Sequence, residues 1–265
     1  MKKLFFIGAG KMATAIAGGL VRSRTFAADE LGAGDIDAAA AASFSQATGV
    51  ECAAGEYLPD GEAVLLAVKP QMLASALAGK EDLLRERLVI SIVAGVSIAR
   101  LTELTGSARV IRVMPNTPAL VGCGASGYAA SAGAGAADVE LAAKILNAVG
   151  ISMRLAEREL DAVTGLSGSG PAYVFEFINA LADGGVADGL PRSVALQLAA
   201  QTVAGAARMV LESGTHPAVL RDMVTSPGGT TARALEVLAE RGFAGTVVKA
   251  VRAATARSEE LGKKS

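Results

Sequence analysis

The sequence predicts an α/β fold, in which an N-terminal, doubly wound and mostly parallel sheet is followed by an all-helical domain. Short apolar runs alternate with helix-forming segments from residue 4 to residue 155, and most runs end at small or turn-forming residues. From Ala156 onward no further strand is needed, and residues 194–211 are apolar on nearly all sides, with the single charge of Arg208. Alternating strands and helices are typical of a parallel sheet. We therefore expect a sheet domain at residues 1–156 and a helical domain at residues 157–265.

A strand followed by a helix opens the chain. Leu4–Ile7 is a run of four apolar residues ended by Gly8, too short for a buried helix, so we expect a strand buried on both faces. Met12, Ile16 and Leu20 then recur at helical spacing.

At this junction Gly8, Gly10 and Ala13 form a G-x-G-x-x-A pattern. Gly8 permits a tight turn, Gly10 lets a diphosphate approach the backbone, and Ala13 lets the helix pack closely on the strand. The diphosphate would lie on free N–H groups at the helix N-terminus. The pattern predicts dinucleotide binding in a fold of the Rossmann type, and the alternative is a tight turn with a purely structural role.

An acidic residue follows the second predicted strand, Leu31–Gly34. Asp35 or Asp37 stands where dinucleotide-binding folds commonly bind the adenosine ribose hydroxyls. The alternative is that the acid caps the next helix. We expect that helix at Ala38–Ala47 and a third strand at Val50–Ala53.

Two further buried strands are expected at Ala63–Val68 and Leu88–Val93. The first ends at Lys69-Pro70, and small residues beginning with Ala94 follow the second. Because ligands of open parallel sheets lie beyond the carboxyl ends of the strands, the end of the first strand is expected near the dinucleotide. The alternative for Lys69 is an ordinary solvated lysine.

The strand expected at Arg109–Met114 is broken by two prolines with Asn116 between them. Asn116 could hydrogen-bond a substrate or a carboxamide, and the alternative is that it bonds its own backbone. The remaining elements expected before residue 156 are a strand at Ser126–Ala129, a helix at Ala136–Ala148 and an edge strand at Ile151–Leu155.

The composition indicates a protein that associates with itself. Of 265 residues, 51% are hydrophobic and only 19% are charged, and the mean hydropathy is +0.42. An apolar helix such as 194–211 must be covered on every side, which a small helical domain cannot easily do alone. We therefore expect an intertwined homodimer.

Several function classes are disfavoured by charge and by cysteine content. A formal net charge of −1 gives no electrostatic case for binding nucleic acid or an anionic membrane. Cys52 and Cys123 lie far apart without a C-x-x-C pattern, so neither a disulfide framework nor a metal site is expected. Glycine interrupts the apolar run behind Lys2-Lys3, so no signal peptide is expected, and we expect a cytoplasmic protein. Prolines and glycines exclude the uncharged stretch 113–137 as a membrane span.

Two loops of the second domain, Thr164–Tyr173 and Val224–Thr231, are rich in small and hydroxyl residues and lead into helices. Such loops offer backbone N–H donors without obstructing side chains, which suits a small carboxylate ligand. The alternative is ordinary helix capping by Ser169 and Thr230.

Taken with the first domain, these segments resemble the successive motifs of the pyrroline-5-carboxylate reductase family, in family order and over almost the whole chain. The matching segments are Phe6–Ala13, Ala67–Gln71, Arg112–Pro118, Ser167–Tyr173 and Ser226–Thr231. The resemblance implies a Rossmann domain, a helical domain that forms a homodimer, and often a larger ring of dimers. It also implies the last step of proline biosynthesis, in which NADPH or NADH reduces the C=N bond of 1-pyrroline-5-carboxylate to give L-proline.

The resemblance also implies roles for individual residues. Thr231 matches the threonine that hydrogen-bonds the imine nitrogen and is the candidate catalytic residue, and Asn116 joins it as a candidate for substrate binding. The remaining candidates for the substrate are Ser226, Gly229 and Thr230. The candidates for the cofactor are Ile7, Gly8, Ala9, Gly10, Lys11, Met12, Asp35, Ala67, Val68, Lys69, Pro70 and Ala94.

Two departures from the family pattern concern the cofactor. Gly55-Glu56 stands where family members often carry Asn, and Asp35 stands where Ser, Asn or Arg would suit a 2′-phosphate. Because an acid there repels that phosphate, NADPH is the family default but NADH is plausible. His216, the only histidine, precedes a proline in a polar loop and is expected to face solvent. The alternatives to this function are a related imine or β-hydroxy-acid reductase and a non-catalytic dinucleotide-binding protein.

Overall fold

The computed structural model describes residues 1–262, and its internal contacts divide the chain into two compact units. Unit 1 comprises Met1–Ser169 together with the segment that starts at Ala253, and unit 2 comprises Gly170–Arg252. Residues 157–169 and 253–262, which the division at residue 156 assigns to the helical domain, therefore pack with the sheet. The domain boundary at 156 stays a prediction.

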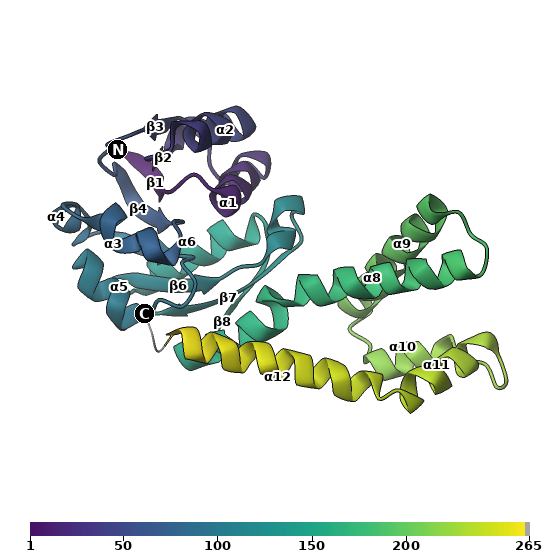
Figure 1. The fold of residues 1–265 in the computed structure, drawn as a ribbon. Coiled ribbons are helices and arrows are strands. Elements are labelled where there is room, and N and C mark those ends of the chain that lie inside the picture. The colour runs from purple at the N-terminus through teal and green to yellow at the C-terminus, as the bar shows by residue number, and fades with distance from the viewer. Residues whose placement is uncertain (263–265) are drawn as a thin grey trace. The chain divides into compact units, whose positions relative to one another are not determined.

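Unit 1 is built on a sheet of eight strands (Figure 1). The strands are β1 (Lys2–Ile7), β2 (Leu31–Asp35), β3 (Cys52–Ala54), β4 (Gly61–Leu66), β5 (Leu88–Ser91), β6 (Val110–Met114), β7 (Gly124–Ala130) and β8 (Gly150–Arg154). Their order is β3-β2-β1-β4-β5-β6-β7-β8, and every neighbouring pair is parallel except β6 with β7. The chain reverses its direction across the sheet between β1 and β4, which is where folds of this type bind ligands.

Helices cover both faces of the sheet, which confirms the doubly wound fold. They are α1 (Lys11–Arg22), α2 (Ala38–Thr48), α3 (Leu73–Leu77), α4 (Glu81–Leu84), α5 (Ile98–Thr105), α6 (Ala136–Asn147) and α7 (Leu160–Val163). Short 3₁₀ turns are η1 (Ala28–Glu30), η2 (Pro70–Met72), η3 (Thr117–Val121) and η4 (Glu157–Glu159), and η5 (Thr164–Gly168) is a π-helical turn.

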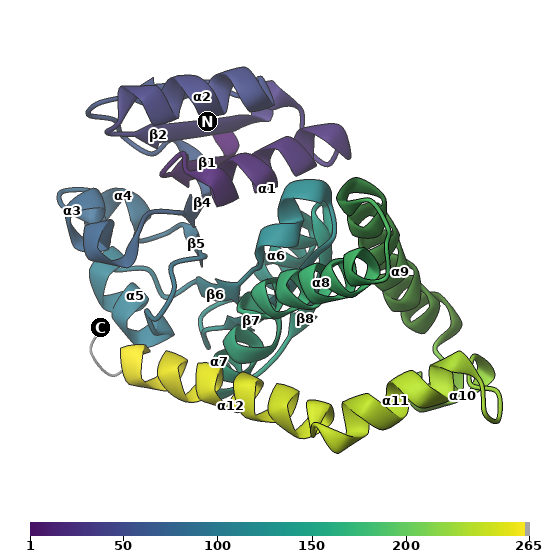
Figure 2. The ribbon, with the colours of Figure 1, turned by 45° about the vertical axis from the view of Figure 1, so that its right-hand side comes forward.

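Alternation along β1 explains the two layers. Leu4 and Phe6 join a buried cluster with α1, α2 and α6, whereas Phe5 and Ile7 join a second cluster with α3, α4 and α5. Figure 2 shows α3, α4 and α5 together on one side of the strands. Because successive side chains point to opposite faces, a strand that is apolar at every position must be covered on both.

Two predicted strands end two residues earlier than expected at their carboxyl ends. β4 ends at Leu66 instead of Val68, and β5 ends at Ser91 instead of Val93. Beyond these ends the backbone still bonds neighbouring strands, as Ala67 N–H does to the Ile7 carbonyl at 2.8 Å, but the chain leaves the ladder. The apolar run of the sequence extends past the end of β5 because Val93 is buried, although Val93 does not pair with a neighbouring strand.

Unit 2 is helical, as predicted, and is built from α8 (Gly170–Ala187), α9 (Arg192–Ser213), α10 (Pro217–Met223), α11 (Thr230–Glu240) and the first half of α12 (Phe243–Gly262). Its buried hydrophobic residues, among those the structure describes, are only Ala182, Ala195 and Ala199. By length and composition α9 could cross a membrane, and 11% of its most apolar window is buried.

The second half of α12 belongs to unit 1. The Ser258 hydroxyl donates to the Asp161 carboxylate at 2.6 Å, which ties this part of the helix to α7.

Candidate cofactor and substrate site

The turn between β1 and α1 has the geometry that its glycines predict. Gly8 has φ of +100°, and a Cβ there would lie 2.9 Å from the Ala67 carbonyl oxygen, so no other residue fits without displacing the backbone. A Cβ on Gly10 would meet nothing within 4 Å. The chain itself therefore does not require glycine at position 10, whereas a ligand lying against the backbone would.

The N-terminus of α1 is open to an anion. Gly10 is its N-cap residue and has no side-chain cap, and the first turn carries no acidic residue. Ala13 is completely buried, so the helix lies close to the sheet. Uncapped N–H groups together with the helix dipole favour a phosphate at this position.

Asp35 and Asp37 have different roles. Asp37 is the N-cap of α2, and its carboxylate accepts from the N–H groups of Ala39 and Ala40 at 2.9 and 3.4 Å. Asp35 faces the glycine turn, where one carboxylate oxygen accepts from Ala9 N–H at 2.7 Å and the other from Asp37 N–H at 2.9 Å. The helix-capping alternative thus holds for Asp37, and Asp35 remains the candidate for the ribose.

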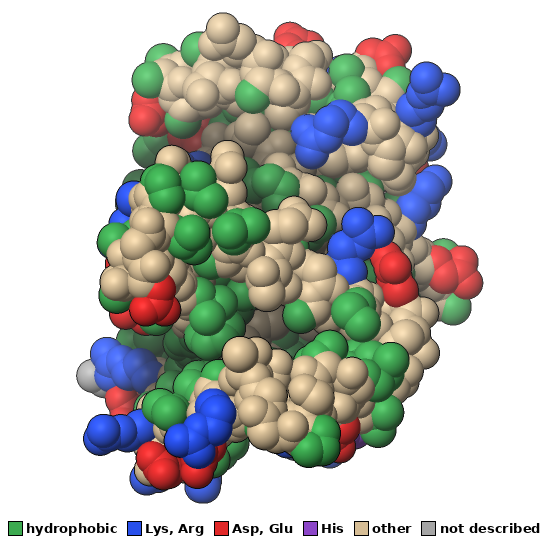
Figure 3. All heavy atoms as spheres, turned by 90° about the vertical axis from the view of Figure 1, so that its right-hand side faces the viewer, with side chains coloured by type: hydrophobic (Ala, Val, Ile, Leu, Met, Phe, Trp, Pro, Cys, Tyr) green, Lys and Arg blue, Asp and Glu red, His purple; other side chains and the backbone are tan. Residues whose placement is uncertain are grey.

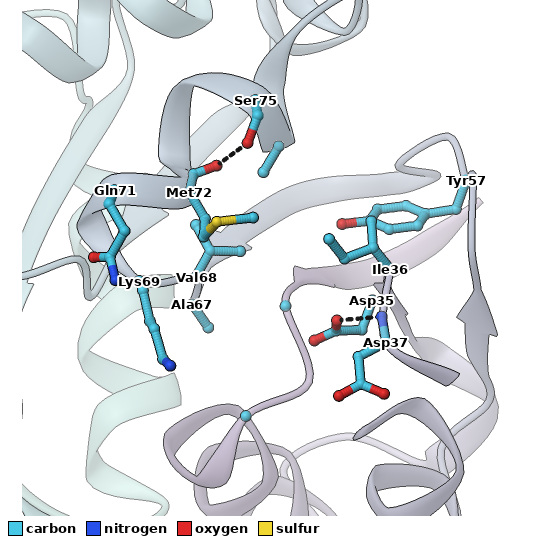
Figure 4. A pocket seen from close by; sticks show the side chains of 13 residues that line it. Asp35, Ile36, Asp37, Tyr57, Ala67, Val68, Lys69, Gln71, Met72 and Ser75 are labelled. Carbon is cyan, nitrogen blue, oxygen red and sulfur yellow. Dashed lines mark hydrogen bonds between the residues drawn. The ribbon is translucent and has the colours of Figure 1, made fainter. Parts of the chain in front are cut away.

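A cavity of about 530 Å³ lies beyond the carboxyl ends of β1, β2 and β4 (Figure 4). Asp35, Ile36 and Asp37 line one side, and Lys69, with the following turn, lines the other. The full lining is Gly8, Gly10, Asp35, Ile36, Asp37, Tyr57, Ala67, Val68, Lys69, Gln71, Met72, Ser75 and Ala76. Apolar walls with a few charged groups suit a nucleoside whose base is buried and whose ribose is hydrogen-bonded.

Tyr57 forms part of this wall although nothing in the sequence pattern singled it out. Its ring packs against Gly34 and against the Phe5 ring, whose centroid is 5.9 Å away, and Lys80 Nζ lies 5.4 Å from the ring centroid. Burial, reinforced by the Asp35 charge, raises the pKa of Tyr57 to about 12. Its hydroxyl is therefore neutral at physiological pH and can only exchange hydrogen bonds with a ligand.

Cys52, on β3, shares this environment. Burial, followed by the Asp35 charge, raises the pKa of its thiol to about 11. A thiol held protonated in this way is a poor nucleophile. Asp35 is therefore the charged group of this corner of the site.

The structure brings only part of the predicted cofactor set to the cavity. Gly8, Gly10, Asp35, Ala67, Val68 and Lys69 line it, whereas Ile7, Ala9, Lys11, Met12, Pro70 and Ala94 do not. Ile7 is buried at the end of β1, Ala9 holds Asp35, and Pro70 begins η2. Ala94 is exposed in the turn after β5. Ile36, Gln71, Met72, Ser75 and Ala76 also line the cavity, although the sequence pattern did not single them out as candidates.

Asn116 is 8% exposed and bonded to the backbone through both ends of its amide. Its carbonyl oxygen accepts from Ala125 N–H at 2.9 Å, and its NH₂ group donates to the Ser167 carbonyl at 3.1 Å. The side chain therefore ties η3 to β7 and to η5. Asn116 thus bonds backbone groups, as its structural alternative predicted, but those groups belong to distant segments of the chain. The substrate role of Asn116 stays a prediction.

In unit 2 the loop before α11 has the expected small-residue geometry. Gly228 has φ of +68°, Gly229 N–H donates to the Ser226 carbonyl at 3.0 Å, and a Cβ on Gly229 would collide with the Ser226 hydroxyl. Gly229 is the N-cap of α11 and has no side-chain cap, so Thr230 is not the cap. Thr231 is half-buried in the first turn. Open N–H groups beside two hydroxyls suit a carboxylate.

His216 is exposed and caps α10, its Nδ1 accepting from Ala218 N–H at 3.2 Å. No group of three or more metal-ligating side chains occurs within residues 1–262.

Comparisons with known proteins agree with this architecture. A family model described as pyrroline-5-carboxylate reductase dimerisation matches residues 157–261, and one described as NADP oxidoreductase, coenzyme F420-dependent, matches residues 3–95. A pyrroline-5-carboxylate reductase from Methanosarcina acetivorans is 43% identical over 99% of each chain.

Two solved structures are similar over nearly the full length. That of a pyrroline-5-carboxylate reductase from Coxiella burnetii superposes with a TM-score of 0.90 at 35% identity, covering 98% of both chains. That of Plasmodium falciparum pyrroline carboxylate reductase with NADP bound superposes with a TM-score of 0.86 at 33% identity, again over 98% of both chains.

Proposed function

The chain belongs to the pyrroline-5-carboxylate reductase family, and from this premise we propose how its own residues serve that reaction. It is an oxidoreductase that uses NADPH to reduce the C=N bond of 1-pyrroline-5-carboxylate to L-proline, the last step of proline biosynthesis, and it acts as a homodimer. The observation that carries this conclusion is the identity of 43% with a reductase of that name over 99% of both chains.

The residues around the glycine turn fit the cofactor. When bound, the nicotinamide ring supplies the hydride. The open N-terminus of α1 and the free space at Gly10 would hold the diphosphate, and Asp35 would bind the adenosine ribose. Lys69 would add a positive charge on the opposite side of the cavity.

The loop before α11 would hold the substrate. Ser226 and Thr230 offer hydroxyls, and the first amides of α11 offer N–H donors, so together they would bind the carboxylate. The Thr231 hydroxyl makes no hydrogen bond among residues 1–262, so it is available to orient the imine nitrogen. A cyclic imine is basic enough to take its proton from solvent, and Thr231 then needs only to fix the direction of attack.

Replacing Thr231 tests this assignment. We expect Thr231→Ala to lower kcat by about 10- to 1000-fold, because orientation and a hydrogen bond to the reacting atom are lost together. Thr231→Ser keeps the hydroxyl and is the matched control, with kcat close to that of the wild type. An unchanged kcat in Thr231→Ala, in a protein that is still dimeric by light scattering, would remove Thr231 from the mechanism.

We further propose that this enzyme also accepts NADH as a cofactor. The Asp35 carboxylate stands at the ribose end of the cavity, and the side chains lining that end include no Lys or Arg to balance a 2′-phosphate. A carboxylate can accept hydrogen bonds from two free ribose hydroxyls but repels a phosphate.

An isosteric substitution separates charge from geometry here. Asp35→Asn keeps an oxygen that can accept from Ala9 N–H and removes only the charge. We expect the ratio of kcat/KM for NADPH to that for NADH to rise by about 10-fold, on the scale of one charge interaction of 1.4 kcal/mol. A ratio that does not change would exclude Asp35 as the group that sets the preference.

Oxidation of NADPH on addition of pyrroline-5-carboxylate, measured beside other cyclic imines and β-hydroxy acids, tests the reaction and its two alternatives.

We also propose a cytoplasmic location, in keeping with two free thiols, and a ring of dimers as the larger assembly. Cell fractionation tests the first proposal and analytical ultracentrifugation the second.

A further inference from the structure

The turn between β5 and α5 is fixed on both sides and carries Ala94 at its tip. Ile92 N–H donates to the Leu66 carbonyl at 3.0 Å, and the side chains of Val93 and Val96 are 2% and 3% exposed. Ala94 is exposed between these two buried anchors. The turn lies at the carboxyl edge of the sheet, on the side of β4 away from the adenosine cavity. In a fold of this type that side receives the nicotinamide half of the cofactor.

Glu157 holds the end of this turn from a distant part of the chain. One of its carboxylate oxygens, Oε1, accepts from the backbone N–H of Ile98, the first residue of α5, at 2.7 Å. The Ser97 hydroxyl accepts from the N–H of Arg100, three residues further on, at 3.2 Å. The first turn of α5 is therefore capped partly by its own sequence and partly by a carboxylate 59 residues away.

Arg112 fixes the carboxylate in turn. Its Nη1 lies 3.0 Å from the same Glu157 Oε1, and its side chain on β6 is only 14% exposed, against 35% for Glu157. A guanidinium that is this well buried requires a counter-charge, so the carboxylate cannot rotate away without leaving it unpaired.

The backbone beneath Glu157 is also rigid. Leu155 N–H donates to the Tyr128 carbonyl at 2.8 Å, and Ala156 N–H donates to the Glu159 carboxylate at 2.7 Å. Glu157 is thus a fixed point joined to β6 on one side and to α5 on the other.

We propose that Glu157 is a positioning residue for hydride transfer, which holds the Ala94 turn in place through the Ile98 N–H group and is itself held by Arg112. The inference rests on the proposed function, together with the cofactor contact at Ala94 that the family resemblance implies. Loss of the carboxylate releases the end of the turn, and a displacement of about 1 Å at a reacting centre lowers a rate by up to 100-fold. The adenosine and diphosphate contacts lie elsewhere, so the affinity for the cofactor changes little.

Two variants disturb the contact in different ways. Glu157→Gln removes the charge that Arg112 and Ile98 share. Ile98→Pro removes the N–H donor and leaves the ion pair intact, and proline is well tolerated at the first position of a helix. Ser97, which precedes it, already has the extended backbone that a following proline requires, with φ of −75° and ψ of 158°.

The matched control is Asp138→Asn, which breaks another ion pair of the same strand region. Arg109 Nη2 lies 2.6 Å from Asp138 Oδ1, the carboxylate is 8% exposed, and the pair lies just before β6 begins, at its amino end. Asp138→Asn should therefore lower the stability of the protein without changing the Ala94 turn.

Hydrogen–deuterium exchange without cofactor is the first measurement. In Glu157→Gln and in Ile98→Pro we expect the amides of residues 93–100 to exchange at least several-fold faster than in the wild type, and in Asp138→Asn to exchange at the wild-type rate. Unchanged protection of this segment in both test variants overturns the inference.

The kinetic isotope effect on kcat, measured with NADPH carrying deuterium at the transferred position, is the second. We expect kcat to fall about 10-fold or more in both test variants and the isotope effect to rise as hydride transfer becomes rate-limiting, while Asp138→Asn retains the wild-type isotope effect. A wild-type enzyme that does not oxidise NADPH with pyrroline-5-carboxylate contradicts the proposed function. An active wild type whose two test variants keep its isotope effect overturns this inference alone.

Discussion

The two units of the chain differ in where their large hydrophobic side chains lie. In unit 1 both faces of the sheet are covered, and residues such as Phe6, Leu65 and Ile90 are completely buried. In unit 2 the buried hydrophobic residues among those described are three alanines, whereas most of the large ones are exposed. Figure 3 shows hydrophobic side chains spread over one face of the molecule. The exposed set on α8 and α9 is Val174, Phe175, Phe177, Leu181, Val194, Leu196, Leu198, Met209 and Leu211.

The two units therefore depend on the partner subunit to different degrees. Unit 1 completes its core within one chain, so its cofactor cavity can form in a single protomer. Unit 2 leaves too much apolar surface in water to be stable alone, and the family model that matches it is one of dimerisation. The length and hydropathy of α9, which resemble those of a membrane span, have the same explanation. The substrate loop before α11 should therefore depend on the dimer, and the cofactor turn should not.

The largest expected effect comes from placing a charge on the exposed apolar face of unit 2. Leu198 is 55% exposed in one chain, and we expect Leu198→Glu to convert the dimer to monomer and to abolish nearly all reductase activity, because a charge buried in the interface has no partner. Light scattering and the NADPH assay are the measurements. Leu58→Glu, at a 69% exposed position of unit 1, is the control and should change neither. A dimeric, active Leu198→Glu would place the interface elsewhere.

A second test compares two glycines of the cofactor turn. Gly8→Ala places a Cβ 2.9 Å from the Ala67 carbonyl at a φ of +100°, so we expect it to destabilise unit 1 by about 2 to 3 kcal/mol and to abolish cofactor binding. The Cβ added by Gly10→Ala has no atom within 4 Å, so the thermal stability should equal that of the wild type. Only the affinity for NADPH should fall, by about 10-fold or more. Calorimetry and fluorescence titration separate the two. Equal cofactor affinity in Gly10→Ala and the wild type would contradict the assignment of the diphosphate to this turn.

Acid should weaken unit 1 through the Arg109–Asp138 pair. The hydrogen bond from Arg109 lowers the pKa of Asp138 below its ordinary value of 3.8. The pair therefore stabilises the folded state at any pH above that ordinary value, and its contribution is lost as pH falls through the folded-state pKa.

We expect Asp138→Asn to lower the free energy of unfolding by about 1 to 2 kcal/mol at pH 7, a value reduced by the exposure of Arg109, which is 43%. The difference from the wild type should shrink below about pH 4, where the carboxyl begins to protonate in the unfolded chain, and should disappear below the lowered pKa of the folded state. Thermal melts from pH 3 to pH 7 measure it. A difference that is independent of pH would show that the charge of Asp138 does not contribute.

Most of the fold was predictable because its signals are local. The β1 run, the glycine turn and the following helix need only ten or so neighbouring residues to be recognised, and the structure places all three as expected. The strand ends were less predictable, because an apolar residue such as Val93 is buried in the same way whether it pairs or lies under the edge of the sheet.

The site was predictable only in part, since several of its contacts join distant residues. Asn116 bonds Ala125 and Ser167, and Glu157 bonds Ile98, across separations that no spacing in the sequence encodes. Tyr57 lines the cavity because Gly34 leaves room for its ring, which is a property of a strand and a loop packed together. Local patterns thus identify the turn that binds a ligand, and tertiary packing decides which side chains surround it.

The smallest expected effect is at His216, in unit 2. Its imidazole is exposed and caps α10 through a single hydrogen bond to Ala218 N–H, so we expect His216→Ala to cost at most about 1 kcal/mol of stability. His216→Asn, which can accept the same hydrogen bond, should restore most of it. Because the side chain caps a helix and has no proposed part in the reaction, kcat and its dependence on pH should match the wild type in both variants. If His216→Ala lowered kcat 10-fold or more while the dimer stayed intact, the imidazole would take part in the proton transfer that solvent and Thr231 are proposed to provide.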